Sequence, residues 1–157
     1  MKYTDTMVTF SEVPDEITLC INISGCPNHC FNCHSQELWE DIGEVLDNDT
    51  IASLIEKNNG ISCVGWMGGD ADPAEVNRQA MFVKEKYPLL MTCWYSGKET
   101  LSPEIRIENW DYIKLGPYIE KCGGLDKETT NQRFYFVNEG ELIDWTYKFW
   151  KHHDMEE

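Results

Sequence analysis

Three cysteines stand close together in the chain, at Cys26, Cys30 and Cys33, and they constrain its fold more than any other feature. They follow the apolar run Ile17–Ile23, which predicts a buried strand. The spacing Cys-x3-Cys-x2-Cys allows three thiolates from one loop to converge on a single metal centre. A structural zinc site or an electron-transfer cluster takes four protein ligands, whereas a catalytic metal keeps one position open. The cysteines therefore predict a metal centre with an open position.

Two other kinds of metal site would use the same loop. A zinc knuckle would take His29 or His34 as its fourth ligand. A ferredoxin-like cluster would need a remote fourth cysteine, which in such proteins is usually followed by proline. The other cysteines are not followed by proline, and no two form a close pair: Cys20, Cys63, Cys93 and Cys122. The first three fall within predicted strands, where we expect core packing rather than metal ligation.

Composition narrows the class of protein further. The cysteine count is seven, an odd number, and no apolar stretch of a signal peptide follows Met1. We therefore expect a cytoplasmic protein, in a compartment that keeps thiols reduced. The net charge of −15 disfavours nucleic acid as a partner, and no apolar run approaches the ~20 residues that span a membrane. A length of 157 residues predicts one domain, over residues 1–157.

Strand and helix patterns alternate along the chain. Asp49 is the expected N-cap of one helix, and Asp72 with Pro73 gives a strong start to the next. Further strands are predicted over 61–67, 89–95, 112–115 and 134–137, and helices over 35–39, 50–59, 73–87 and 141–151. Alternation of this kind favours an α/β fold with a mainly parallel sheet and its function at the carboxyl ends of the strands. Because a complete (β/α) barrel takes ~250 residues, we expect a partial, laterally open one.

A second motif, Gly68-Gly69-Asp70, comes directly after a predicted core strand. Glycines allow a positive φ or a close approach of the backbone to a ligand. The carboxylate of Asp70 can accept hydrogen bonds from an ammonium group. A simple strand-to-helix turn would have the same composition. Lys114 also lies at the end of a strand, where it could pair with a carboxylate or face the acidic surface.

Together these motifs resemble those of the radical S-adenosylmethionine enzymes. Within that superfamily the chain is similar to the activating proteins of anaerobic (class III) ribonucleoside-triphosphate reductases, over about Ile17 to Val137. The cysteine spacing carries the resemblance to the superfamily. The resemblance to the family rests on further segments: Trp66–Asp70, Trp94–Gly97, Ile113–Ile119 with its Leu115-Gly116-Pro117 element, and Thr129–Arg133 with Asn131-Gln132-Arg133.

The resemblance implies a fold, cofactors and site residues. It implies a radical S-adenosylmethionine type of partial barrel in which Cys26, Cys30 and Cys33 hold a [4Fe-4S] cluster. The fourth iron would take the amino and carboxylate groups of S-adenosylmethionine. The residues expected at the cosubstrate are His34, Gly68, Gly69, Asp70, Ser96 and Lys114. Asp70 stands where the superfamily has a longer Glu, which leaves its direct contact with the methionine ammonium open. No protein side chain is expected to act as a catalytic acid, base or nucleophile.

The resemblance also implies a reaction and partners. An electron from the reduced cluster would cleave S-adenosylmethionine to methionine and a 5′-deoxyadenosyl radical. That radical would install a glycyl radical on anaerobic ribonucleoside-triphosphate reductase. The electron would come from a donor such as flavodoxin or ferredoxin. Two alternatives stay open: a short radical S-adenosylmethionine enzyme acting on a small molecule or peptide, and a non-catalytic iron-sulfur or zinc protein.

Overall fold

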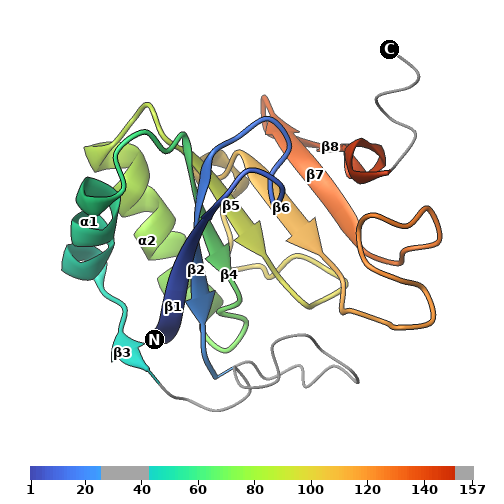
Figure 1. Cartoon of the computed structure of the whole chain (residues 1–157), viewed down its shortest axis with the longest axis horizontal. Coiled ribbons are helices and arrows are strands. Elements are labelled where there is room, and N and C mark those ends of the chain that lie inside the picture. Colours follow the sequence, from blue (N-terminus) through green and yellow to red (C-terminus); the bar gives the residue numbers. More distant parts are fainter. Residues whose placement is uncertain (26–42, 151–157) are drawn as a thin grey trace.

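The computed structural model describes residues 1–25 and 43–150 (Figure 1). Its strands are β1 (Lys2–Thr9), β2 (Thr18–Ile23), β3 (Glu44–Val45), β4 (Cys63–Met67), β5 (Met91–Tyr95), β6 (Tyr112–Leu115), β7 (Arg133–Asn138) and β8 (Glu141–Asp144). Its α-helices are α1 (Asn48–Lys57) and α2 (Pro73–Lys86), and two 3-10 turns follow at η2 (Ile107–Asn109) and η3 (Thr146–Phe149). The strands predicted at 17–23, 61–67, 89–95, 112–115 and 134–137 are confirmed as β2, β4, β5, β6 and β7. The helix expected over 35–39 lies outside the described residues.

All eight strands form one mixed sheet in the order β3-β1-β2-β4-β5-β6-β7-β8. The three central pairs, from β2 to β6, are parallel, and the four outer pairs are antiparallel. The part of the chain that the structure describes has only two α-helices. The prediction of a partial, laterally open (β/α) barrel of the radical S-adenosylmethionine type, with a mainly parallel sheet, is therefore wrong. The physical reason is that β1 joins β2 antiparallel, while β6, β7 and β8 pair antiparallel through a long loop and a hairpin turn, without a crossover helix.

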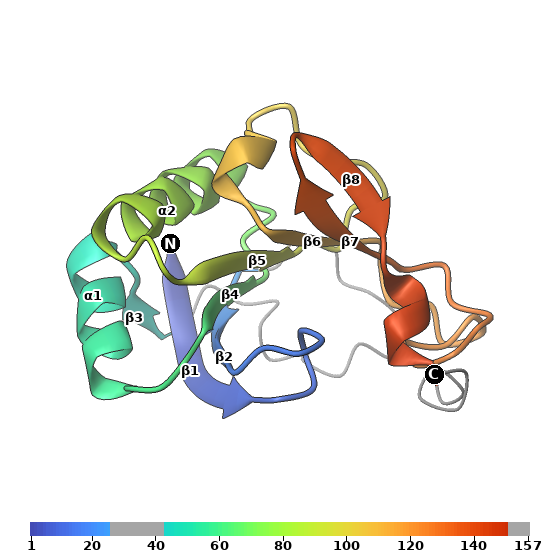
Figure 2. The same cartoon turned by 90° about the horizontal axis from the view of Figure 1, so that it is seen from above.

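The larger core lies between the sheet and the two helices. Alternate side chains of the central strands point to this face, among them Ile21, Trp66 and Trp94, all at most 1% exposed. They pack against the inward faces of α1 and α2, to which Ile51 and Val76 belong. Figures 1 and 2 show the two helices side by side on this face. The central strands are apolar on both faces, as is usual for a parallel sheet.

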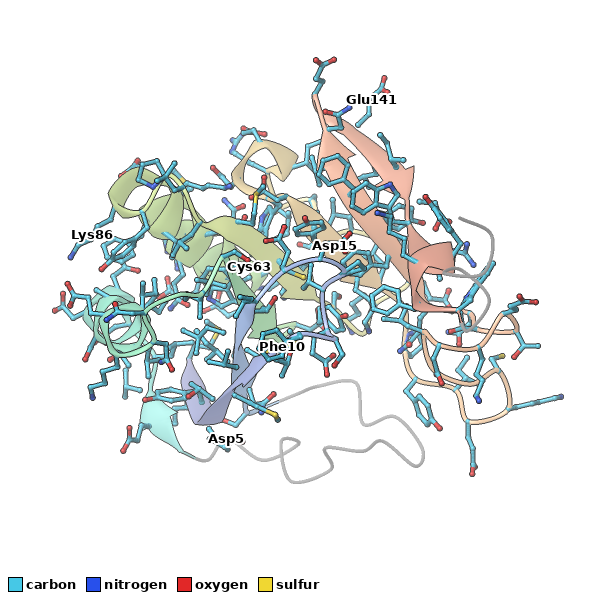
Figure 3. All side chains as sticks on the ribbon, turned by 45° about the horizontal axis from the view of Figure 1, so that its top comes forward. Asp5, Phe10, Asp15, Cys63, Lys86 and Glu141 are labelled. Carbon is cyan, nitrogen blue, oxygen red and sulfur yellow. The ribbon has the colours of Figure 1, made fainter. Side chains whose placement is uncertain are left out.

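A smaller core lies on the opposite face of the sheet. It contains Cys63, Cys93, Tyr112 and Phe134, each at most 4% exposed, together with Val13 from the loop between β1 and β2. Figure 3 shows Cys63 in the interior of the sheet. Within the described residues, this loop and the η3 segment cover the face in place of helices.

The helix starts follow from capping. Asp72 caps α2 as predicted: its Oδ1 accepts a hydrogen bond from Glu75 N at 3.3 Å, and Pro73 occupies the first turn. The cap of α1 is Asp47 and not Asp49, because the Oδ1 of Asp47 accepts from Thr50 N at 2.8 Å. Both aspartates suit a helix start, so sequence alone did not separate a cap from a first-turn acid.

The C-terminal helix predicted over 141–151 is wrong where the structure describes it. Glu139 and Gly140 both have positive φ, at 51° and 78°, and they join β7 to β8 in a two-residue hairpin. Positive φ at both central residues is the requirement of a type I′ turn, which suits the twist of paired strands. The apolar residues after Gly140 have helical spacing, yet Leu142 and Ile143 lie in the exposed strand β8, which this turn directs back along β7. The strands β1 and β3 were not predicted either.

Candidate functional site

The carboxyl ends of four parallel strands meet at one edge of the sheet (Figure 1). The residues that follow these ends are Ser24-Gly25 after β2, Gly68-Gly69-Asp70 after β4, Ser96-Gly97 after β5 and Gly116 after β6. The structure thus brings together the five predicted site residues that it describes: Gly68, Gly69, Asp70, Ser96 and Lys114. The other predicted site residues, Cys26, Cys30, Cys33 and His34, lie outside the described residues. Gly25 directly precedes the first of them.

Asp70 links the ends of β4 and β5. Its Oδ1 accepts a hydrogen bond from the Oγ of Ser96 at 2.6 Å, and its Oδ2 accepts one from Gly97 N at 2.8 Å. The hydroxyl of Ser96 accepts in turn from Lys98 N at 3.1 Å, and the serine is 1% exposed. Hydrogen bonds to a carboxylate are among the strong ones in proteins. Asp70 therefore fixes the loop after β5, whatever else it contacts.

The two glycines are required by the turn itself. Gly68 and Gly69 have φ of 114° and 95°, a region that side chains other than glycine rarely adopt. A Cβ on Gly69 would lie 2.5 Å from a methyl group of Val76, and one on Gly68 would lie 3.2 Å from the carbonyl oxygen of Ile23. The carbonyl of Gly68 also accepts a hydrogen bond from Trp94 Nε1 at 2.7 Å. This turn explains both glycines without a ligand.

Lys114 places a positive charge just below the edge. It is 7% exposed, and its Nζ donates hydrogen bonds to the carbonyl oxygens of Ser96 at 3.0 Å and Gly116 at 2.9 Å. The same Nζ lies 5.4 Å from the centre of the Tyr95 ring, within range of a cation–π interaction. The ammonium group ties the end of β5 to the end of β6. Its charge can also attract an anionic group brought to this edge.

The Leu-Gly-Pro and Asn-Gln-Arg segments meet at the same edge. Asn131 Nδ2 donates a hydrogen bond to the carbonyl oxygen of Pro117 at 2.9 Å. Gly116 has a φ of 112°, and a Cβ there would lie 3.1 Å from the Cα of Gln132. Neither segment is among the site residues that the sequence predicts. Their proximity depends on the antiparallel pairing of β6 with β7, which no local pattern states.

A cavity of about 360 Å³ opens beside these turns. It is lined by Met1, Lys2, Ile23, Ser24, Gly25, Gly69, Ala71 and Asp72. One lining residue, Gly25, directly precedes Cys26 in the chain, and another, Gly69, belongs to the Gly68–Asp70 turn. Lys2 was missed because β1 was not predicted. The only sequence signal was an alternating polar and apolar run at the start of the chain.

A second cavity, of about 430 Å³, lies away from these motifs, at the carboxyl ends of α1 and α2. Its lining includes Ile55, Tyr87, Leu89 and Leu90. Although it is the larger of the two, it touches none of the predicted site residues. We therefore assign the candidate site to the smaller cavity at the carboxyl edge.

The buried cysteines lie away from this edge, in the sheet itself. Burial raises the pKa of Cys20 to about 11 and raises the pKa of Cys63 and Cys93 further. Thiols that keep their protons are poor metal ligands. Within residues 1–25 and 43–150, no group of three histidine, cysteine or acidic side chains could hold a metal ion.

Comparison with known proteins gives no further assignment. The chain matches no family model, no curated protein and no solved structure. Among the described residues, none of the helices has the length and apolar character needed to cross a membrane.

Proposed function

We propose that this protein is a radical S-adenosylmethionine enzyme that installs a glycyl radical on an anaerobic ribonucleoside-triphosphate reductase. One observation carries the proposal. The Cys-x3-Cys-x2-Cys segment begins in the sequence two residues after Ser24. Ser24 follows β2, at the sheet edge where the Gly68–Asp70 turn, Ser96 and Lys114 converge. The resemblance of the motifs to those of radical S-adenosylmethionine enzymes supports the reaction. The fold gives no such support, because the sheet is mixed and does not form the partial barrel that the resemblance implies.

The residues at this edge fit the cofactors that the motifs imply. Three thiolates leave a cluster with one iron that no protein ligand occupies. The lining of the cavity includes Lys2 and Gly69, together with Gly25, which directly precedes the cysteine segment in the chain. When bound, the [4Fe-4S] cluster and S-adenosylmethionine would supply the capacity to abstract a hydrogen atom.

The side chains of the chain itself would bind and orient. The carboxylate of Asp70 holds Ser96 and Gly97 in place, so the loop after β5 is fixed before any ligand arrives. The ammonium group of Lys114 would favour a carboxylate at the edge. Both oxygens of Asp70 already accept hydrogen bonds, which supports a positioning role in preference to direct recognition of an ammonium group.

The proposed substrate is a glycine in a loop of the reductase, and the proposed electron donor is a flavodoxin or ferredoxin. We propose the cytoplasm as the location, because cluster thiolates need a reducing compartment. The net charge of −15 favours a docking patch of positive charge on the reductase. Such docking would weaken as salt is added.

The experiment that tests this function combines three components under anaerobic conditions: the reduced, iron-loaded protein, S-adenosylmethionine and the anaerobic reductase of the same organism. The expected result is the doublet of a glycyl radical in electron paramagnetic resonance. It should vanish when the acceptor glycine of the reductase is replaced by alanine. Cleavage of S-adenosylmethionine without any doublet would transfer the assignment to a small-molecule or peptide substrate.

A further inference from the structure

The loop between β1 and β2 lies over the smaller core. We call its residues Phe10–Glu16 the strap, and Figure 3 labels Phe10 and Asp15 on it. One strap side chain, Val13, is 0% exposed and packs in the smaller core with Cys63 and Cys93, which are also 0% exposed. The strap therefore covers two thiols that the candidate site does not use.

Side chains of the sheet hold the strap in place. The carboxylate of Glu16 accepts hydrogen bonds from the hydroxyls of Tyr112 at 2.6 Å and Ser62 at 2.7 Å. The hydroxyl of Tyr95 donates a hydrogen bond to the carbonyl oxygen of Glu12. These bonds attach the strap to β5, to β6 and to the residue before β4.

The backbone of the strap is paired much less than that of the strands. Between described residues it makes one internal hydrogen bond, from Glu16 N to the carbonyl oxygen of Val13 at 3.2 Å. Backbone contacts with β4 begin after the strap, at Ile17, whose carbonyl oxygen accepts from Ser62 N at 2.8 Å and Cys63 N at 3.2 Å. Segments with few buried apolar contacts and few backbone hydrogen bonds open at a lower free energy than the whole molecule.

We propose that the strap opens as a unit while the sheet stays folded, and that each opening exposes the thiols of Cys63 and Cys93 to small electrophiles. Opening breaks the three side-chain hydrogen bonds and withdraws Val13 from the smaller core, but it leaves the pairing of β1 with β2 intact. It also frees the hydroxyl of Tyr95, whose ring lies 5.4 Å from Lys114 Nζ at the candidate site.

The reactivity of the two thiols reports the opening. In the closed protein they are shielded from solvent and burial raises their pKa, so they are poor nucleophiles. Alkylation then proceeds through open molecules, at a rate set by the fraction that is open. Opening of the strap exposes little surface, so this rate should not change at low urea concentrations. Unfolding of the whole chain exposes far more surface and depends steeply on urea.

Alkylation of the full chain with N-ethylmaleimide under anaerobic conditions tests the proposal, with Cys63 and Cys93 followed separately by peptide mass spectrometry. We expect a rate that is independent of urea below the unfolding transition. Tyr112→Phe and Tyr95→Phe should each raise that rate about threefold to tenfold, because each removes one hydrogen bond to the strap and keeps the ring. Tyr135→Phe is the matched control, since Tyr135 packs against the larger core, and it should leave the rate unchanged.

Two results would overturn the proposal. One is a rate for both thiols that rises from the lowest urea concentration with the slope of global unfolding, which would mean that they react only in the unfolded chain. The other is a rate that Tyr112→Phe and Tyr95→Phe change no more than Tyr135→Phe does, which would show that the strap does not control access to the thiols. Circular dichroism confirms that each variant is folded.

Discussion

Asp70 is the residue on which the order of the candidate site depends. It accepts from a hydroxyl and from a backbone N–H, on the loop that follows the neighbouring strand. Removing one partner of a buried hydrogen bond leaves the other with its desolvation cost. The Asp70–Ser96 pair is therefore a direct probe of how the carboxyl edge is held together.

We predict that Ser96→Ala lowers the free energy of unfolding by about 1–3 kcal/mol, because Asp70 Oδ1 and Lys98 N both lose their partner. Urea denaturation measures the effect. Asp126→Asn is the control, since Asp126 is an exposed carboxylate that lies 3.7 Å from Lys127, and surface pairs contribute little. Equal stability of the Ser96 variant and the parent would show that the Asp70 network has no structural role.

The residues of the site were easier to predict than their contacts. Each described one follows a strand with a clear apolar pattern or, in the case of Lys114, lies near the carboxyl end of such a strand. Parallel strands end at one edge, so convergence followed from the pattern. The hydrogen bonds of Asp70 did not follow from it, because they depend on the register of β4 against β5. The role of Asn131 was missed for the same reason, since its contact with Pro117 crosses an antiparallel pair.

At the scale of elements, the apolar central strands were predictable and the outer strands were not. The pattern of β2, β4 and β5 is apolar on both faces, which is distinctive. The strand β1 is half exposed, and its charged and polar residues interrupt the apolar pattern by which a strand is predicted. In β8 every residue is exposed, so its sequence contains no burial pattern to detect. The sheet is mixed because β1, β7 and β8 pair antiparallel with their neighbours. Two of these strands were not predicted, and the direction of β7 does not follow from its own sequence, which led to the wrong fold class.

The hairpin between β7 and β8 gives a prediction at this scale. Gly140→Ala should lower the free energy of unfolding by roughly 1 kcal/mol, because a φ of +78° strains a side chain even though no atom lies within 4 Å of the added Cβ. The matched control is Gly124→Ala, where φ is not positive and the nearest atom is 3.4 Å away. Thermal unfolding of both variants gives the comparison, and equal losses would contradict the type I′ turn.

A substitution at the neighbouring position should act in the opposite direction. Glu139 also has positive φ, at 51°, and its side chain is exposed. Asparagine tolerates this conformation better than glutamate, so Glu139→Asn should raise the melting temperature slightly. A decrease in the melting temperature would mean that Glu139 makes a contact that outweighs the backbone strain.

At the scale of the whole molecule, the smaller core contributes to how stability depends on pH in alkaline solution. Burial raises the pKa of Cys63, Cys93 and Tyr95 above ordinary values of 9.0 for a thiol and 10.0 for a phenol. Burial and then the hydrogen bond to Glu16 raise the pKa of Tyr112. In alkali the unfolded chain loses these protons first, while the folded chain retains them. The stabilisation is therefore complete at a pH below the pKa values that these groups have in the unfolded chain, and it is lost as the pH rises above those pKa values.

We predict that the free energy of unfolding falls steadily above about pH 9. Cys63→Ala should reduce that slope by removing one of the groups whose pKa is raised. The matched control is Cys122→Ala, which removes a thiol outside the two cores. Urea denaturation across pH 7 to 11 measures both slopes. If the two variants alter the slope equally, burial in the second core is not its cause.

The central claim is that the cysteine segment holds a cluster that cleaves S-adenosylmethionine, and one measurement tests it directly. The protein is reconstituted with iron and sulfide under anaerobic conditions, reduced, and assayed for 5′-deoxyadenosine formed from S-adenosylmethionine. We predict about four irons per chain and steady formation of 5′-deoxyadenosine. Cys30→Ala should lose both, while Cys122→Ala should retain both. A chain that binds one zinc, takes up no iron and forms no 5′-deoxyadenosine would contradict the claim.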